Sequence, residues 1–316
     1  MLRLFTIDKG LIREIQSDGA TVEDIRKADW IDALEPGEDE RELLQSLLRI
    51  DLPESDDVEE IEASARCFVD QAGLHVHSLF LAPHEGRYDT VSVACILQPK
   101  RLITIRDNDT ADFRLLRLRA RRGQVSSASP AELLVTLFEQ KVENHADTLE
   151  DIHYQLEKVS HLVLEDEEAE LEDAISKLAQ LEDSNGKMRL CLMDTQRNIS
   201  FLLRHLSGIS DYRETMREII RDVETLMSHT TFLFDKINFL MDSTQGFINI
   251  EQNQIIKTFS IAAVVFLPPT LVASIYGMNF HFMPELDWQL GYPGALALMV
   301  ASGFAPYWYF KRKGWL

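Results

Sequence analysis

Several motifs that define common functional classes are missing from this sequence. Its 316 residues include three cysteines, Cys67, Cys95 and Cys191, which are too few and too widely spaced for a disulfide framework and have no CxxC spacing for zinc. No GxxxxGK[ST] loop, the signature of an ATP- or GTP-binding site, occurs in the chain. No nucleophile–base pair or cofactor loop stands out either, so nothing in the sequence indicates an enzyme.

Charged residues are absent from two long stretches near the C-terminus, Thr258 to Ile275 and Leu290 to Phe310. Each is about long enough to cross a hydrocarbon core of roughly 30 Å, given a helical rise of about 1.5 Å per residue. We therefore expect two transmembrane helices joined by a short loop.

Positive charge is also absent from that loop, 277–289. Lys257 precedes the first stretch, and Lys311, Arg312 and Lys313 follow the second. Lys and Arg beside a span tend to stay on the cytoplasmic side. The start of the chain lacks the apolar run and the cleavage site of a secretory signal. We expect both termini in the cytoplasm and the loop outside.

The rest of the chain is strongly acidic. Residues 257–316 hold four Lys or Arg and two acids, so the net charge of −20 leaves −22 on residues 1–256. Such a surface repels nucleic acid and anionic lipid and attracts cations. The alternative to a role in attracting cations is that the negative charge only keeps the protein soluble.

Two kinds of pattern divide the chain. Short β-rich runs at Leu74–Leu81, Val91–Leu97 and Arg101–Ile105, with a helical stretch at Glu38–Leu48, predict an α/β layer with a mixed sheet. Helical periodicity dominates from about Phe113 onward. We expect a cytoplasmic α/β domain (1–128) followed by a helical hairpin (129–209), with the hairpin tip at the acidic patch 165–173 and a turn at Gly208. A stalk helix should then continue into the first span (210–276). An external loop (277–289), a second span (290–310) and a basic cytoplasmic tail (311–316) complete the chain.

One face of the stalk helix is unusually polar for a helix that enters a membrane. Facing the axis of a helix bundle, small and polar residues would make a narrow, partly hydrated path. Ile256 and Leu267 interrupt this face and would form constrictions that exclude water, with Phe259 close by. The alternative is a coiled-coil seam whose Asn residues set the register. The face, called the polar stripe below, consists of Asp242, Gly246, Asn249, Asn253, Ile256, Ser260, Ala263, Leu267, Thr270, Ser274 and Gly277.

Pro268 and Pro269 lie within the first span. They remove two backbone donors and should bend or loosen the helix there.

The motif Tyr276-Gly277-Met278-Asn279, followed by Met283-Pro284-Glu285-Leu286 and a second span ending in Lys311-Arg312-Lys313, resembles the CorA family of magnesium transport proteins. A bare Gly-Met-Asn tripeptide would carry no information, but its position between two C-terminal spans is specific. The resemblance to the proteobacterial branch extends over nearly the full length, through 61–66, 181–183, 189–196, 247–253 and 266–270.

This resemblance implies a funnel-shaped homopentamer of the bacterial inner membrane that mediates potential-driven Mg²⁺ influx and is closed by cytoplasmic Mg²⁺. Co²⁺ and Ni²⁺ are further candidate ions, and Mg²⁺ is substrate and regulatory ligand, with no cofactor. It implies a selectivity loop at Gly277, Met278 and Asn279, in which Asn279 holds hydrated Mg²⁺. It also implies an inner acidic ring at Asp242 and a polar ring at Asn253. The implied hydrophobic gate consists of Ile256, Phe259 and Leu267. The polar stripe adds Asn249 and Thr270 as pore-lining residues.

Two other interpretations remain at this point. A zinc transporter of a related branch shares the Gly-Met-Asn motif, and His75 and His77 have the spacing of two ligands on one face of a strand. A membrane-anchored scaffold would explain the long helix and the spans, but not the polar stripe or Asn279. His281 stands where many relatives carry Glu, which predicts uptake that depends on pH near 6 to 7, or an inert loop residue.

Overall fold

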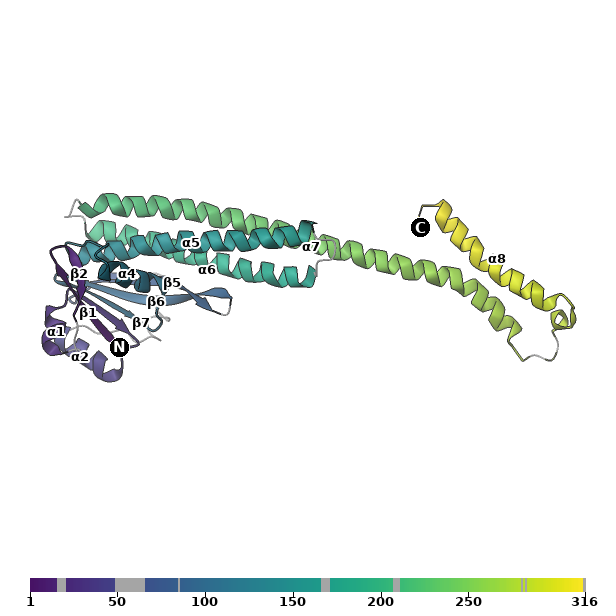
Figure 1. Cartoon of the computed structure of the whole chain (residues 1–316), viewed down its shortest axis with the longest axis horizontal. Helices are drawn as coiled ribbons and strands as arrows, with labels where there is room; N and C mark the ends of the chain where they lie inside the picture. Colours follow the sequence, from purple (N-terminus) through teal and green to yellow (C-terminus); the bar gives the residue numbers. More distant parts are fainter. Residues whose placement is uncertain are drawn as a thin grey trace. The chain divides into compact units, whose positions relative to one another are not determined.

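The computed structural model describes residues 1–15, 21–48, 66–84, 86–165, 171–206, 211–279, 281 and 283–314. The chain divides into two compact units, Met1–Met241 and Asp242–Leu316, and helix α7, Asp211–Tyr276, contributes to both. Figure 1 labels the α-helices and most of the strands. The motif at residues 61–65, the turn at Gly208 and residues 166–170 of the acidic patch lie outside the described part.

The first unit contains a seven-stranded sheet in the order β2-β1-β3-β7-β6-β5-β4. The parallel pairing of β3 with β7 among antiparallel neighbours makes the sheet mixed, as predicted. All three predicted strands are present, as β5, β6 and β7. The strands are β1 Leu2–Asp8, β2 Leu11–Glu14, β3 Trp30–Leu34, β4 Cys67–Val69, β5 Leu74–His84, β6 Arg87–Gln98 and β7 Arg101–Arg106.

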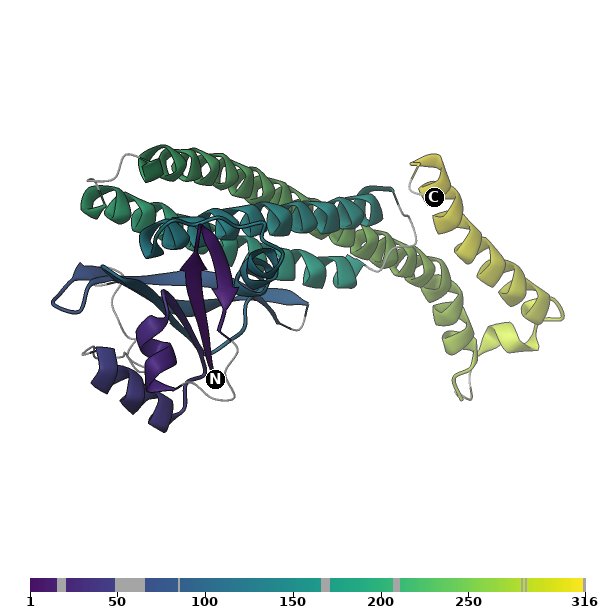
Figure 2. The same ribbon diagram turned by 60° about the vertical axis from the view of Figure 1, so that its left-hand side comes forward.

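Helices cover both faces of this sheet (Figure 2). Side chains of successive strand residues point to opposite faces, so the neighbours Trp30 and Ile31, both fully buried, belong to different apolar clusters. The cluster around Ile31 includes Ile25 of α1, Val22–Lys27, and Leu44 of α2, Glu38–Leu48. The larger cluster around Trp30 includes residues of α4, Ala111–Arg121, and of the long helices.

Three long helices form the other layer of the first unit: α5, Pro130–Glu165, α6, Leu171–His205, and the part of α7 before Asp242. Proline opens α5, where its missing N–H costs no hydrogen bond, and the Ser129 hydroxyl accepts a hydrogen bond from the Glu132 N–H at 3.2 Å. Apolar residues spaced by three and four pack α5 against α6. The Asn185 side chain of α6 donates to the Thr230 carbonyl of α7 at 3.0 Å.

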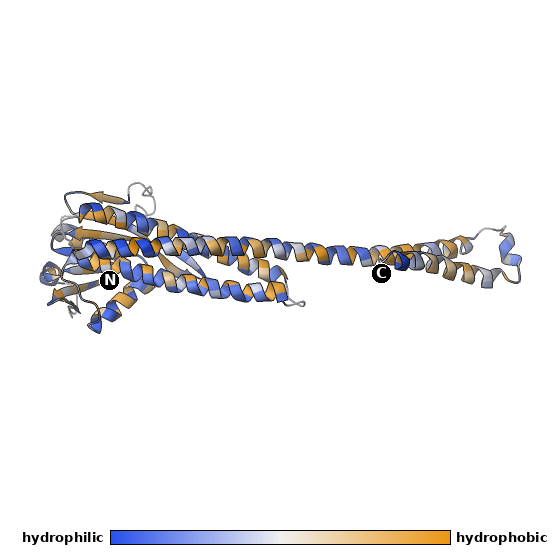
Figure 3. Cartoon of the chain, turned by 90° about the horizontal axis from the view of Figure 1, so that it is seen from above, coloured by the Kyte–Doolittle hydropathy of each residue, from blue (hydrophilic) through white to orange (hydrophobic). Residues whose placement is uncertain are grey.

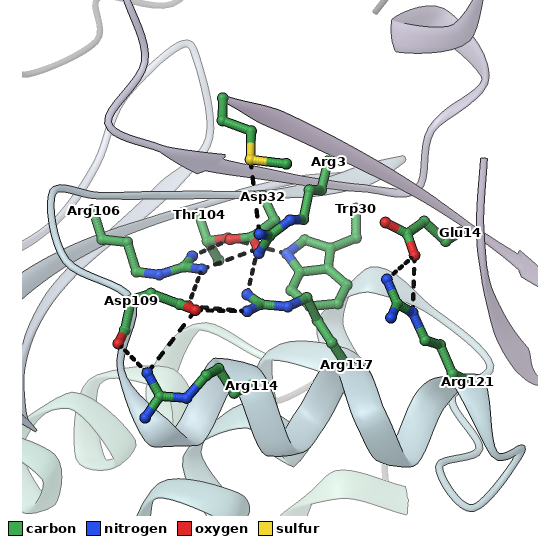
Figure 4. A network of polar contacts seen from close by, with 11 residues as sticks. Arg3, Glu14, Trp30, Asp32, Thr104, Arg106, Asp109, Arg114, Arg117 and Arg121 are labelled. Carbon is green, nitrogen blue, oxygen red and sulfur yellow. Dashed lines mark hydrogen bonds and ion pairs between the residues drawn. The ribbon is translucent and has the colours of Figure 1, made fainter. Parts of the chain in front are cut away.

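Three buried charges form ion pairs, with Asp32 on β3 paired to both Arg106 on β7 and Arg117 on α4 (Figure 4). The Asp32 carboxylate, fully buried, accepts hydrogen bonds from Arg106 and from Arg117. Arg117 also donates to Asp109 at 3.0 Å, and Thr104 donates to Asp32 at 3.0 Å. Because a buried charge without a partner is costly, this network fixes how α4 sits on the sheet.

A second buried polar cluster joins β5 to α5 and α6. The Asp194 carboxylate accepts from the Ser78 hydroxyl at 2.8 Å and from the Asn198 amide at 2.9 Å, while the Lys141 ammonium donates to Ser78 at 2.8 Å. Burial lowers the pKa of Lys141 and raises that of nearby Asp112 to about 6. These contacts anchor the hairpin helices to the sheet.

Candidate functional site

The second unit contains the rest of α7, the short 3-10 helix η2, Pro284–Asp287, and α8, Gly291–Arg312. No residue of α8 is buried, and Figure 3 shows α8 and the C-terminal part of α7 as predominantly hydrophobic, whereas hydrophobic and hydrophilic residues alternate along α5 and α6. Among the described helices, α7 alone has the length and apolar composition of a membrane span, in a window with no buried residue. The predicted second stretch is a helix of 22 residues whose Tyr, Trp and Pro residues lower its hydropathy.

One face of α7 is in contact with α8. A Cβ built on Gly303 of α8 would lie 3.2 Å from the Pro269 ring and 3.5 Å from the Val265 carbonyl oxygen. Pro269 has no N–H, so this carbonyl lacks its usual helical donor, and the glycine lets α8 approach it closely. Helix α7 is continuous through both prolines. An apolar hollow of about 570 Å³ beside this contact is lined on α7 by Val265, Phe266 and Pro269.

The polar stripe lies on the opposite face of α7. At about 100° per residue, Ala263, Leu267, Thr270 and Ser274 point about 100–160° away from Pro269. All four are exposed, and Leu267 is 64% exposed. The Thr270 hydroxyl donates to the Phe266 carbonyl of the same helix at 2.7 Å. The packing of α8 therefore leaves this face of the helix uncovered.

The upstream candidates lie on the same helix. Asp242, Asn249 and Asn253 are exposed, as is Ile256 at 62%. Phe259, 72% exposed, lies at the edge of the stripe. The structure thus aligns the predicted pore-lining and gate residues along one face of α7. Among the described residues, no observed hydrogen bond or ion pair links any of them to η2 or α8.

The Gly-Met-Asn residues form the end of α7. The Gly277 N–H donates to the Ala273 carbonyl at 2.9 Å, and the Met278 N–H donates to Ile275 at 3.3 Å. A Cβ on Gly277 would lie 3.0 Å from the Ala273 oxygen, so a larger residue would crowd the last turn. Asn279 follows with its side chain exposed.

A second glycine closes the loop after η2. A Cβ on Gly291 would lie 2.3 Å from the Glu285 carbonyl oxygen, a distance that real Cβ atoms do not show. Glycine is therefore required where the chain turns from η2 into α8. Sequence reasoning missed both this residue and Gly303. Small residues within the second span were the signal that could have indicated close packing.

The two histidines weighed as zinc ligands are buried on strand β5. The His75 ring contacts the Asp70 carboxylate at 3.0 Å, and burial lowers the pKa of His77 to about 4. Among the described residues, no group of three or more His, Cys, Asp or Glu is arranged to hold a metal ion. The histidine pair on β5 therefore lacks a third ligand within that part of the chain.

Comparison with known proteins shows similarity over the whole chain. The family model described as CorA-like Mg²⁺ transporter protein matches residues 26–312. Proteins named magnesium transport protein CorA from Pectobacterium atrosepticum and Salmonella typhimurium are each 48% identical to it over 318 residues, covering 100% of both chains.

Solved structures share the fold. The complete structure of the CorA magnesium transporter from Methanocaldococcus jannaschii matches with a TM-score of 0.76 at 18% identity, covering 100% of this chain and 99% of that one. The cytoplasmic domain of ZntB from Vibrio parahaemolyticus matches with a TM-score of 0.55 at 12% identity, covering 78% of this chain and 97% of the domain. The extent of the family match and the identity to the full-length relatives show that the chain belongs to the CorA-like Mg²⁺ transporter family.

Proposed function

We propose that this chain is a channel for Mg²⁺ influx across the bacterial inner membrane. The observation that carries the proposal is the polar stripe, exposed on the face of α7 opposite the contact with α8. Small and polar side chains are poor choices against lipid, so this face suits a hydrated path. The 48% identical relatives named magnesium transport protein support Mg²⁺ as the ion.

A single helix face cannot enclose a path, so the proposal includes a homopentamer with α7 lining the axis and α8 as a second, outer span. The first unit supports self-association, because α7 carries large apolar side chains that its own unit leaves exposed, including Phe232, Phe234 and Phe239. In this arrangement the termini are cytoplasmic and the Gly277 loop is external. Residues 1–128 then form the cytoplasmic α/β domain and 129–209 the hairpin.

At the outer mouth, the proposed selective group is the Asn279 side chain, repeated by symmetry. Mg²⁺ gives up its water reluctantly and demands octahedral geometry. An amide oxygen can accept hydrogen bonds from the hydrated ion without stripping its water, whereas a carboxylate would hold the ion more tightly. Gly277 and Met278 position this residue directly after the last turn of α7.

Below the mouth, Thr270, Asn253 and Asn249 would line the path and Asp242 would attract cations at its inner end. Rings of Leu267, Phe259 and Ile256 would form constrictions that close by excluding water.

The membrane potential is sufficient to drive influx. A divalent ion moving through 100 mV gains about 4.6 kcal/mol, from about 2.3 kcal/mol per charge. Closure is assigned to cytoplasmic Mg²⁺, because residues 1–256 carry a net charge of −22 and repelling copies would separate without bridging cations. Co²⁺ and Ni²⁺ are proposed as further permeant ions.

The test is flux into liposomes that contain a Mg²⁺ indicator and hold an inside-negative potential. We expect wild-type protein to admit Mg²⁺ and Asn279→Ala to abolish entry with oligomer size unchanged. The matched control is Gln289→Ala, which removes an exposed amide from the same loop and should leave flux unchanged.

Each other result has a definite meaning. Flux retained by Asn279→Ala would place selection elsewhere. Entry of Zn²⁺ without Mg²⁺ would indicate a zinc transporter, and no flux of either ion would support a membrane-anchored scaffold.

A further inference from the structure

Two histidines from different helices of the first unit face each other. The Nδ1 atom of His153 on α5 lies 3.1 Å from the Nε2 atom of His229 on α7, and the ring centroids are 5.4 Å apart. Phe232 lies beside both rings, with centroid distances of 6.1 Å to His153 and 6.3 Å to His229. The pair is partly exposed to solvent, so small ions can reach it.

When both rings are neutral, one proton can lie between the two facing nitrogens. A neutral imidazole has one donor and one acceptor nitrogen, so one ring donates to the other. Burial and then the neighbouring His153 lower the pKa of His229, while Glu150 raises it. Glu157 also lies beside the pair, with its carboxylate 3.5 Å from His153 Nε2. With both rings protonated, both facing nitrogens would be donors and the contact would be lost.

A metal ion could replace the shared proton with little movement of either helix. With Zn–N bonds of about 2.0–2.1 Å, two imidazole nitrogens on one ion lie about 3–3.4 Å apart. The observed separation of 3.1 Å falls in this range. Imidazole nitrogen suits Zn²⁺, Co²⁺ and Ni²⁺, whereas Mg²⁺ prefers oxygen ligands.

We propose that His153 and His229 form a binding site for a transition-metal dication such as Zn²⁺. The site excludes Mg²⁺, and the bound ion links α5 to α7. No cluster of three protein ligands occurs among the described residues, so water would complete the coordination. The site is independent of the proposed transport function, because it depends only on contacts within the first unit.

The test is zinc binding to the purified full-length protein at pH 7.5, measured by equilibrium dialysis with excess Mg²⁺ to occupy oxygen-rich sites. The variants are His153→Gln and His229→Gln. The matched control is His161→Gln: His161 also lies on α5 and faces a carboxylate four residues on, Glu165 at 3.1 Å, but its described contacts include no second imidazole.

We expect wild-type protein and His161→Gln to bind one more Zn²⁺ per chain than either His153→Gln or His229→Gln. At pH 5.5 that difference should disappear, because protons compete for the nitrogens. Zinc bound elsewhere would be common to all four proteins. Zinc should also slow hydrogen exchange in wild-type peptides that contain His153 and His229, which tests the site without any substitution.

Equal zinc stoichiometry in all four proteins, or no change in exchange at these two peptides, would overturn the proposal and leave the contact as an ordinary hydrogen bond. Circular dichroism of each variant establishes that the fold is retained.

Discussion

The two compact units of this chain treat their apolar side chains differently. In Met1–Met241, apolar residues from Leu4 to Leu240 are buried in two clusters. In Asp242–Leu316, α8 buries no residue, and Leu298, Val300 and Phe304 are all more than half exposed. The first unit thus carries its own core, whereas the apolar surface of the second needs an environment that the single chain does not supply. Membrane lipid and further copies of the chain fill that requirement in the proposed channel.

The polar groups differ in the same way. The first unit buries charged residues that are paired within it, such as Asp32 with Arg106. The second unit leaves every residue of the polar stripe exposed except the half-buried Gly246. The paired buried charges of the first unit therefore specify one packing, whereas the proposed channel assigns the exposed polar groups of the second unit to contact with ions.

The largest expected effect is on the buried charges of the first unit. Asp32→Ala leaves the fully buried Arg106 without that carboxylate and should lower stability by about 3–5 kcal/mol. The measurement is hydrogen exchange in peptides from β3 and β7 at increasing urea concentration, and the urea midpoint of the loss of protection reports stability. Glu143→Ala, which breaks an exposed ion pair with Arg119, is the control and should cost less than about 1 kcal/mol. Equal losses would mean that the buried network contributes no more than a surface pair.

A matched pair of leucines compares the apolar side chains of the two units directly. Leu192 of α6 is fully buried, and Leu192→Ala should cost about 2–5 kcal/mol through lost contacts and a cavity. Leu298 of α8 is 52% exposed, and Leu298→Ala in detergent-solubilised protein should cost less than about 1 kcal/mol. Hydrogen exchange in peptides around each site reports the loss. A loss at Leu298 as large as that at Leu192 would contradict the difference between the units.

A smaller effect than at Leu192 is expected at the contact between α7 and α8. Gly303→Val would push side-chain atoms against the Pro269 ring and should destabilise this packing by about 1–3 kcal/mol. Gly294→Val is the control, because a Cβ at Gly294 meets no atom within 4 Å. We expect the α8 amides to exchange hydrogen faster in Gly303→Val but not in Gly294→Val. Identical exchange would show that the close approach at Gly303 is not needed.

Most secondary structure could be predicted because its signals are local. Alternation of period two and apolar spacing of three and four placed β5, β6, β7 and the long helices near their observed bounds. The partition of helices between the two faces of the sheet could not be predicted, nor could the pairing of Asp32 with Arg106, 74 residues apart. Such contacts depend on which distant elements meet, and periodicity carries no information about that.

The candidate site divides in the same manner. The sequence by itself determined the family, through the Gly277–Asn279 motif and its place after an uncharged stretch. It also determined that small and polar residues share one face of α7, because helical spacing follows from residue order. Only the tertiary structure decided which face α8 covers, through the fit of Gly303 against Pro269, and that His153 and His229 lie 3.1 Å apart. The reason is physical: residue order sets the direction of a side chain around its own helix, but only packing between helices decides what that side chain meets.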